Sequence, residues 1–217
     1  MGSIAENIKH IRETLPDGVD LVCVSKYFPV ESIREAYNAG ERLFGESRVQ
    51  ELTAKAAVLP KDIKWHFIGH LQTNKVKQVV ELADMIQSVD SARLLDAIEH
   101  AAAAIGKVQK CLIEVHVAQE ETKTGFSPHD FAVFMRQTDW TLYPHIKICG
   151  LMGMASNTDE TERIRKDFAT LKALAGLSAL RNVSMGMSGD YSLAIECGSN
   201  LVRVGSAIFG ARNYNKQ

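Results

Sequence analysis

A lysine at the end of an apolar run is the first residue of this sequence that is placed for covalent chemistry. Lys26 follows the run Leu21-Val-Cys-Val24 after one intervening serine. If this run is a strand of a parallel sheet, apolar on both faces, Lys26 lies at the carboxyl edge of that sheet. Desolvation there lowers the pKa of an amine and makes it nucleophilic. The alternative is a surface lysine whose stem lies against the strand end.

Two loops near the carboxyl end of the chain consist of small residues, Ser188-Gly189-Asp190 and Gly205-Ser206-Ala207. Small side chains let backbone N–H groups approach an anion, and serine hydroxyls add further donors. The two loops together predict a phosphate site. Tight turns that need glycine would leave a similar pattern.

Arg203 lies between Val202 and Val204, inside an apolar run. A buried arginine is costly unless it has a partner. A reactive lysine beside a phosphate site indicates a phosphorylated carbonyl compound, either pyridoxal 5′-phosphate (PLP) or the sugar phosphate of a Schiff-base aldolase. With PLP, Arg203 could donate to the pyridine nitrogen. Otherwise we expect it to form a salt bridge with Glu46 or Glu196.

Other polar candidates have ordinary structural explanations. His66 and His70 are four residues apart but fall on a strand and a turn, so they do not share a face as on a zinc-binding helix. We expect a packed His66, a loop His70, a core Trp65 and no metal site. Lys123, in a polar loop, is expected at the entrance of the site rather than at the reactive position.

Short apolar runs alternate with amphipathic segments along the chain. The apolar runs predict strands at Asp20–Val24, Arg42–Gly45, Lys64–Ile68, Met85–Val89, Val108–Val117, Ile146–Met152, Asn182–Met187 and Leu201–Val204. The amphipathic segments predict helices at Ser3–Thr14, Val30–Ala39, Val49–Val58, Asn74–Leu82, Ser91–Ile105, Pro128–Thr138, Asp159–Leu174 and around Tyr191–Cys197.

Eight such strands with helical crossovers predict a (β/α)8 TIM barrel with an extra N-terminal helix, in one domain over residues 1–217. A doubly wound open sheet would normally carry a glycine-rich turn after its first strand, and Ser25-Lys26-Tyr27 is not one. Active sites of this barrel class lie at the carboxyl ends of the strands, where Lys26 and both small-residue loops fall.

The composition narrows the function classes. With 25 Lys and Arg against 26 Asp and Glu, the net charge of −1 gives no electrostatic case for nucleic acid or an anionic membrane. The N-terminal segment is polar, so we expect neither a signal peptide nor a membrane span. The four cysteines form no C-x-x-C pair, which is typical of reduced thiols in a cytoplasmic protein. A closed barrel has no free sheet edge, which favours a monomer or weak dimer.

Several segments together resemble the pyridoxal phosphate homeostasis protein family, whose members are built like the barrel domain of bacterial alanine racemase. The resemblance covers nearly the whole chain. Its motifs are Leu21-Val-Cys-Val-Ser-Lys-Tyr27, Phe44-Gly-Glu46 with Gln50-Glu51, Trp65-His-Phe-Ile-Gly-His-Leu-Gln72 with Asn74-Lys75, Lys123-Thr-Gly125, Gly150-Leu-Met152, Ser184-Met-Gly-Met-Ser188, and Val202-Arg-Val-Gly-Ser-Ala-Ile-Phe-Gly-Ala-Arg212.

The resemblance implies a Schiff base between PLP and Lys26, Arg203 facing the pyridine nitrogen, and phosphate held by Ser188, Gly205 and Ser206, with Met187 also in the cofactor site. It further implies buffering and delivery of PLP, with apo PLP-dependent enzymes as partners and no established turnover. Ser47 stands where the family usually has Asn, and it is left out of the expected set.

Three functions remain open: a PLP carrier in PLP homeostasis, a PLP-dependent amino-acid racemase, and a Schiff-base aldolase. A racemase needs a base on each face of the substrate carbon, and the sequence supplies Lys26 without a clear second base. An aldolase would react with an added carbonyl substrate and show no visible chromophore as purified.

Overall fold

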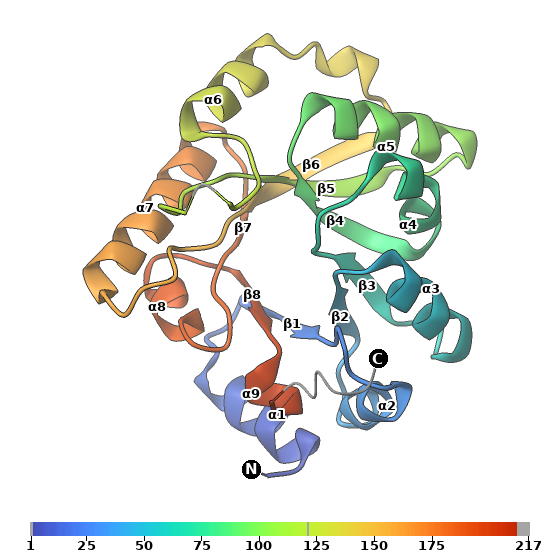
Figure 1. The fold of residues 1–217 in the computed structure, drawn as a ribbon, viewed down its shortest axis with the longest axis vertical. Helices are drawn as coiled ribbons and strands as arrows, with labels where there is room; N and C mark the ends of the chain where they lie inside the picture. Colours follow the sequence, from blue (N-terminus) through green and yellow to red (C-terminus); the bar gives the residue numbers. More distant parts are fainter. Residues whose placement is uncertain (1, 121, 212–217) are drawn as a thin grey trace.

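Eight parallel strands close into a barrel in the computed structural model of the chain, with helices around it (Figure 1). The structure describes residues 2–120 and 122–211. Each strand pairs with its neighbours in sequence, and the last strand returns to the first. The strands are β1 (Asp20–Val24), β2 (Leu43–Glu46), β3 (Lys64–Phe67), β4 (Ala83–Val89), β5 (Gln109–Glu114), β6 (Ile146–Met152), β7 (Asn182–Ser184) and β8 (Leu201–Val204).

A helix follows every strand, and one helix precedes them all, so the predicted (β/α)8 barrel with an extra N-terminal helix is confirmed. The α-helices are α1 (Ile4–Thr14), α2 (Val30–Asn38), α3 (Val49–Val58), α4 (Val76–Leu82), α5 (Ala92–Ala104), α6 (Pro128–Gln137), α7 (Thr161–Leu177), α8 (Tyr191–Glu196) and α9 (Ser206–Phe209). Helix α1 lies against α9 near the β1–β8 seam (Figure 1), where Asn7 Nδ2 donates 2.9 Å to the Ile208 carbonyl oxygen.

Polar residues at the helix ends explain several boundaries. Ser3 and Glu6 form a capping box, in which each side chain accepts from the other residue's backbone N–H. Ser91 Oγ accepts from the Leu94 N–H and caps α5, as its sequence position predicts. Gly40 follows α2 with a φ of +105°, a backbone conformation that glycine adopts without strain.

Two apolar layers result from the alternation of side chains along the strands. In β1, Leu21 and Cys23 belong to the large core between barrel and helices, whereas Val22 faces a small cluster inside the barrel. The inner cluster is drawn from strands around the barrel, and its buried members are Val22, Met85, Leu112, Met152 and Leu201. The alternation therefore shows which strand positions point into the barrel.

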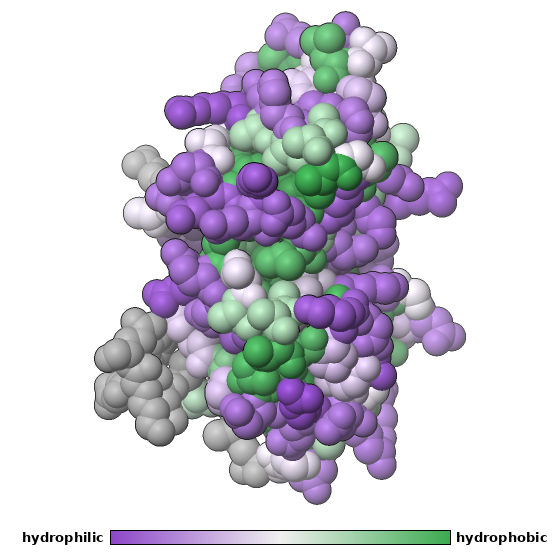
Figure 2. Space-filling view, turned by 90° about the vertical axis from the view of Figure 1, so that its right-hand side faces the viewer, coloured by the Kyte–Doolittle hydropathy of each residue, from purple (hydrophilic) through white to green (hydrophobic). Residues whose placement is uncertain are grey.

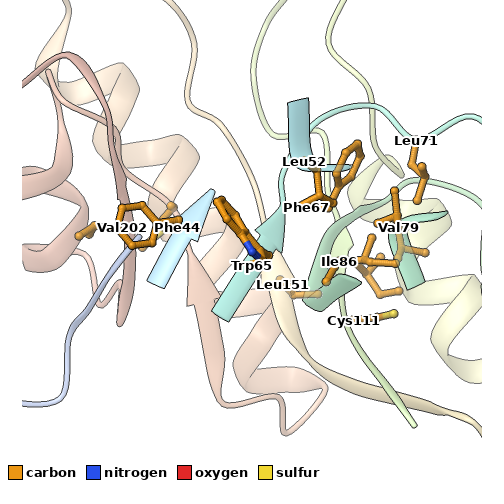
Figure 3. Packing of buried hydrophobic residues seen from close by; sticks show 14 of the residues in the cluster. Phe44, Leu52, Trp65, Phe67, Leu71, Val79, Ile86, Cys111, Leu151 and Val202 are labelled. Carbon is orange, nitrogen blue, oxygen red and sulfur yellow. The ribbon is translucent and has the colours of Figure 1, made fainter. Parts of the chain in front are cut away.

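The outer core contains the bulkiest buried side chains of the described residues (Figure 3). Phe44 on β2 and Trp65 on β3 have ring centroids 5.9 Å apart, and Phe67 belongs to the same cluster as Leu52 of α3. Burying one such side chain stabilises the fold by about 1.5–3 kcal/mol. This layer fixes the helices on the barrel and so holds the strand ends in place.

Two strands, β5 and β7, end three residues earlier than expected from the sequence, whereas the other strands differ by no more than two residues at either end. β5 stops at Glu114 rather than Val117, because the chain turns back at Gly125 and pairs there: Phe126 N–H donates 2.9 Å to the Glu114 carbonyl oxygen. β7 stops at Ser184 rather than Met187, two residues before Gly186, whose φ is +92°. Helix α9 and the short 3-10 helices at Thr73–Lys75 and Trp140–Leu142 were not predicted.

The surface of the α3–α5 side is mainly polar, with separate apolar patches (Figure 2). On this side Ala56, Ala57 and Leu82 line a shallow groove between α3 and α4. Within residues 2–120 and 122–211, no helix has the length and apolar character needed to cross a bilayer.

Candidate functional site

The residues that the sequence singles out come together at the carboxyl ends of β1, β7 and β8. Strands β1 and β8 are adjacent, with Val22 in register with Arg203. Two residues beyond Arg203, the Gly205 backbone lies close to β1: a Cβ added to Gly205 would lie 3.2 Å from the Val24 carbonyl oxygen. Lys26 is two residues beyond Val24, so the lysine and the glycine-containing loop are neighbours.

The alternation in β1 favours an inward position for Lys26. Val22 faces the barrel interior, and Val24 and Lys26 continue the same every-second-residue series. Lys26 itself is half-buried. Lys26 lies in the turn that follows β1, so the inward position of its amine at the barrel mouth stays a prediction.

A buried ion network fixes the backbone just before Lys26. The Lys55 ammonium on α3 donates 2.9 Å to the Ser25 carbonyl oxygen and 2.8 Å to Glu46 Oε1. Ser25 Oγ also donates 2.6 Å to Glu46 Oε1. Burial raises the pKa of the Glu46 carboxyl, and Lys55 opposes this shift. Ser25 is thus held by both its carbonyl oxygen and its hydroxyl.

The same network holds the residue after Lys26. Glu51 Oε2 accepts 2.7 Å from the Lys55 ammonium and 2.7 Å from the Tyr27 N–H. Tyr27 has a φ of +69°, which is uncommon for a residue other than glycine. The Arg48 guanidinium lies over its ring, 4.7 Å from the centroid. Backbone contacts on both sides of Lys26 therefore limit where its side chain can start.

The two small-residue loops contact each other directly. Ser188 Oγ accepts from the N–H of Gly205 at 3.2 Å and from the N–H of Ala207 at 3.3 Å. Two backbone donors thus converge on one oxygen, which is the arrangement that an anion oxygen also requires. Gly186 allows the β7 loop to reach this position, because a Cβ there would lie 2.6 Å from the Ala194 Cβ.

The remaining residues expected around the anion lie at the same rim. Ser206 is exposed and lies between the two N–H donors in sequence. The Met187 side chain is 42% exposed, and its N–H donates 2.6 Å to Asp190 Oδ1. Ser188, Gly205, Ser206 and Met187 are therefore brought together, although Ser188 and Gly205 alone are joined by a hydrogen bond.

Arg203 has a different partner set from the salt bridges that we expected. Its Nη1 donates 2.8 Å to the Ser184 carbonyl oxygen and 2.6 Å to Ser184 Oγ, and its Nη2 donates 3.0 Å to the Gly153 carbonyl oxygen. The alternative, a salt bridge with Glu46 or Glu196 in place of a ligand contact, was wrong. Glu46 lies on the outer side of the barrel with Lys55, and Glu196 pairs with Arg165.

Burial lowers the pKa of the Arg203 guanidinium to about 10, with Glu114 and Asp190 acting against the shift. At neutral pH the group therefore stays charged and can only donate hydrogen bonds. Burial also raises the pKa of the Glu114 carboxyl, although Thr124 Oγ1 donates 2.9 Å to it. A cation held by neutral oxygens thus lies below the barrel mouth.

His66, Trp65 and His70 have the burial expected from the sequence. His66 and Trp65 are buried and His70 is exposed, at 3.1 Å from Asp90. Lys123 Nζ donates 2.6 Å to the Ala155 carbonyl oxygen and lies 3.2 Å from Glu120. All four cysteines are free. The described part of the chain contains no group of three or more His, Cys, Asp or Glu side chains that could hold a metal ion.

Sequence reasoning missed the supporting roles of Lys55, Ser184 and Gln87. A signal for Lys55 existed, since it follows Glu51 by four residues on one helix face. Gln87 and Ser184 each follow a buried apolar strand residue, Ile86 and Val183, but polar neighbours in the same strands make this signal weaker than the one at Arg203. Their partners lie on distant strands and cannot be read from local spacing.

Comparison with known sequences places the chain in one family. Residues 1–213 match the family described as alanine racemase, N-terminal domain. A pyridoxal phosphate homeostasis protein of Aquifex aeolicus is 41% identical over 202 residues, which cover 89% of this chain and 87% of that protein. A protein of the same name from Pasteurella multocida is 34% identical and is matched over 100% of this chain and 97% of its own length.

Comparison with solved structures shows the same barrel fold. PipY of Synechococcus elongatus with PLP bound is 36% identical, with a TM-score of 0.88 over 96% of this chain and 100% of that one. The alanine racemase of E. faecalis is 20% identical, with a TM-score of 0.77 over 99% of this chain and 59% of that one, and so shares the fold. The chain therefore belongs to the alanine racemase N-terminal-domain family and, within it, to the pyridoxal phosphate homeostasis proteins.

Proposed function

We propose that this chain binds PLP at the carboxyl end of its barrel and acts in PLP homeostasis, by buffering the cofactor or delivering it to apo PLP-dependent enzymes. The observation that carries the proposal is the close approach of the Gly205 backbone to the end of β1, where a Cβ added to Gly205 would lie 3.2 Å from the Val24 carbonyl oxygen. Lys26 is two residues beyond Val24, so it lies near the Gly205–Ala207 loop, whose N–H groups converge on one oxygen. The relatives named for PLP homeostasis, and PipY with PLP bound, support the same ligand.

The side chains present fit the three functional groups of PLP. Lys26 supplies an amine for the aldehyde: condensation forms a carbon–nitrogen double bond, a Schiff base, and releases one water. Ser188 and Ser206 supply hydroxyl donors for the phosphate. The N–H groups of Gly205 and Ala207, which donate to Ser188 Oγ in this structure, would turn to the phosphate when it binds. Arg203 supplies a donor for the pyridine nitrogen, and Met187 lies at the exposed rim.

Arg203 beside the ring weakens the electron sink, but alanine racemases share this arginine, so it does not by itself separate a carrier from an enzyme. The carrier is favoured because the sequence supplies Lys26 without a clear second base. PLP supplies an electron sink when it serves catalysis, and this sink works best with a protonated ring nitrogen. Arg203 is charged at neutral pH and donates hydrogen bonds without giving up a proton. A donor at this position keeps the nitrogen unprotonated. The chain therefore holds PLP while its residues give little help to carbanion chemistry.

The proposal also covers the compartment, the domain organisation and the oligomeric state of the protein. The free thiols support a reducing compartment, and we place the protein in the cytoplasm. The closed barrel leaves no sheet edge to pair, which supports one domain over residues 1–217 and a monomer or weak dimer.

Two assays on the PLP-loaded protein test the function. Incubation with each common L-amino acid in D2O should give no α-deuterium exchange or racemisation at enzyme-like rates, about 1 s⁻¹ or faster. Such rates, abolished by Lys26→Ala, would replace the carrier by a racemase. Mixing with an apo PLP enzyme should restore that enzyme's activity, and failure to do so would remove delivery from the account.

A further inference from the structure

Four buried side chains form a hydrogen-bonded row across the barrel interior. Arg203 Nη1 lies 2.6 Å from Ser184 Oγ, Ser184 Oγ lies 2.6 Å from Gln87 Oε1, and Gln87 Nε2 lies 2.7 Å from His66 Nδ1. The residues come from β8, β7, β4 and β3, and none is more than 5% exposed. Side chains from three other strands are therefore linked in series to the guanidinium group of Arg203.

The chemistry of the four groups gives the row one direction. Arginine only donates, so Ser184 Oγ accepts a hydrogen bond from Arg203 and donates one to Gln87 Oε1. The Gln87 amide then points its Nε2–H at His66 Nδ1. His66 Nδ1 must accept, so the imidazole is neutral and carries its proton on Nε2. With the amide reversed, Ser184 Oγ would accept from both Arg203 and Gln87, and its own hydrogen would lose the Gln87 acceptor.

The environment of His66 keeps it in that state. Burial lowers the pKa of the imidazole to about 4. Asp84 opposes the shift, whereas Lys110 and Lys64 add to it. His66 also lines a cavity of 370 Å³ at the opposite end of the barrel, where Asp20, Lys64 and Asn182 begin their strands. The row thus runs from that cavity to the arginine of the ligand site.

We propose that Gln87 and His66 are positioning residues that orient Arg203 toward the ring nitrogen of bound PLP. They act through Ser184: with its hydrogen committed to Gln87, the Ser184 hydroxyl presents a lone pair to Arg203 Nη1. The Ser184 and Gly153 carbonyl oxygens complete the set that fixes the guanidinium plane. This inference rests on the proposed function, because it assumes that Arg203 faces the pyridine ring.

The test compares PLP with its 1-deaza analogue, in which a C–H group replaces the ring nitrogen. Gln87→Met keeps the length of the side chain and removes both of its hydrogen bonds. We expect it to weaken PLP binding about fivefold, the effect of one hydrogen bond, while the affinity for the analogue stays the same. Equal losses for both ligands would mean that Gln87 serves only the fold, and would overturn the proposal.

Gln109→Met is the matched control. Gln109 is also a fully buried glutamine, on the next strand β5, and its Nε2 donates to the backbone oxygens of Asp84 and Lys110. It should not alter the ratio of the two affinities. A shift in that ratio as large as with Gln87→Met would show a general effect of losing a buried amide and overturn the proposal.

Arg203→Lys separates this inference from the proposed function. It should weaken PLP more than the analogue. If it does so and Gln87→Met does not, the row is overturned and the ring contact stands. If Arg203→Lys affects both ligands equally, the ring contact itself is wrong, and the positioning role is overturned with it.

A measurement on the unaltered protein covers the case in which Gln87→Met does not fold. Nitrogen-15 NMR of the imidazole should show a neutral His66 at pH 7 with the proton on Nε2. A proton on Nδ1 would make His66 the donor and the Gln87 oxygen the acceptor of this hydrogen bond. The direction of the row would then be wrong, and the proposal would be overturned.

Discussion

Lys55 on α3 donates a 2.9 Å hydrogen bond from its buried ammonium to the carbonyl oxygen of Ser25, the residue that precedes Lys26. The same ammonium pairs with Glu46 and Glu51, and Glu51 accepts from the N–H of Tyr27 on the other side. A cation that itself stays under the helix layer thus sets the backbone around the proposed PLP-binding lysine.

Replacing Lys55 by methionine should destabilise the protein and loosen the loop. The variant leaves the Glu46 carboxylate buried without its cation, a loss of about 3–5 kcal/mol in the free energy of unfolding. Urea titration measures this loss. PLP affinity, measured under conditions where the variant is folded, should also fall, because Ser25 and Tyr27 no longer hold Lys26 in one position.

Lys110→Met is the control for that variant, since Lys110 pairs with Asp84 at 3.3 Å with both side chains substantially exposed. An exposed pair contributes no more than about 1 kcal/mol. If the two lysine variants lost equal stability, the buried network would have no special role in holding the loop.

Ser188→Ala combined with Ser206→Ala should weaken the binding of PLP more than the binding of pyridoxal. Each hydrogen bond to a charged oxygen contributes about 1.5–3 kcal/mol, or roughly 10- to 150-fold in affinity. Pyridoxal lacks the phosphate and should be much less affected. The affinities can be measured from the absorbance or fluorescence change on binding.

Ser192→Ala provides a comparison, because Ser192 is an exposed serine on the neighbouring helix α8. It should leave both affinities unchanged. Equal losses for PLP and pyridoxal in the double variant would place the phosphate away from these loops.

The buried imidazole of His66 should make the protein less stable in acid. Its folded-state pKa of about 4 lies below the ordinary 6.5, so as the pH falls below 6.5 the unfolded chain takes up a proton that the folded chain does not. The stability present above pH 6.5 is lost progressively down to pH 4. At 1.36 kcal/mol per pKa unit, the loss is on the order of 3 kcal/mol.

His66→Asn isolates this effect, because the amide oxygen can still accept from Gln87 but does not titrate in this range. Glu46 and Glu114 have raised pKa values and act in the opposite direction, and they remain in both proteins. Urea titrations at pH 7 and pH 4 should show a larger acid loss in the unaltered protein than in the variant. Identical losses would mean that His66 is protonated in the folded state.

The sequence predicts the barrel well because the signals for its strands are local. The strands at Asp20–Val24, Ile146–Met152 and Leu201–Val204 have the predicted bounds, since apolar runs and turn residues delimit them. The expected end of β5 at Val117 was wrong, because the pairing of Val115 and His116 with Phe126 depends on how the loop returns.

The position of the site could be predicted from the sequence, but the residues that hold Arg203 in place could not. Lys26 and Ser188 follow strands, so the barrel topology alone assigns them to one end. The partners of Arg203 could not be inferred from spacing, because Ser184 and Gly153 meet it, and Gln87 meets Ser184, only when the sheet closes. A salt bridge was the natural expectation for a buried guanidinium, and three neutral oxygens take its place.

The central claim is that Lys26 is the residue that binds PLP covalently, and one measurement tests it most directly. Borohydride reduces the carbon–nitrogen double bond between a lysine and PLP and so attaches the pyridoxyl group permanently. Peptide mass mapping of the reduced, PLP-loaded protein should locate that group on Lys26, and Lys26→Ala should lose it. Attachment to Lys123 or Lys75 in the unaltered protein would contradict the account.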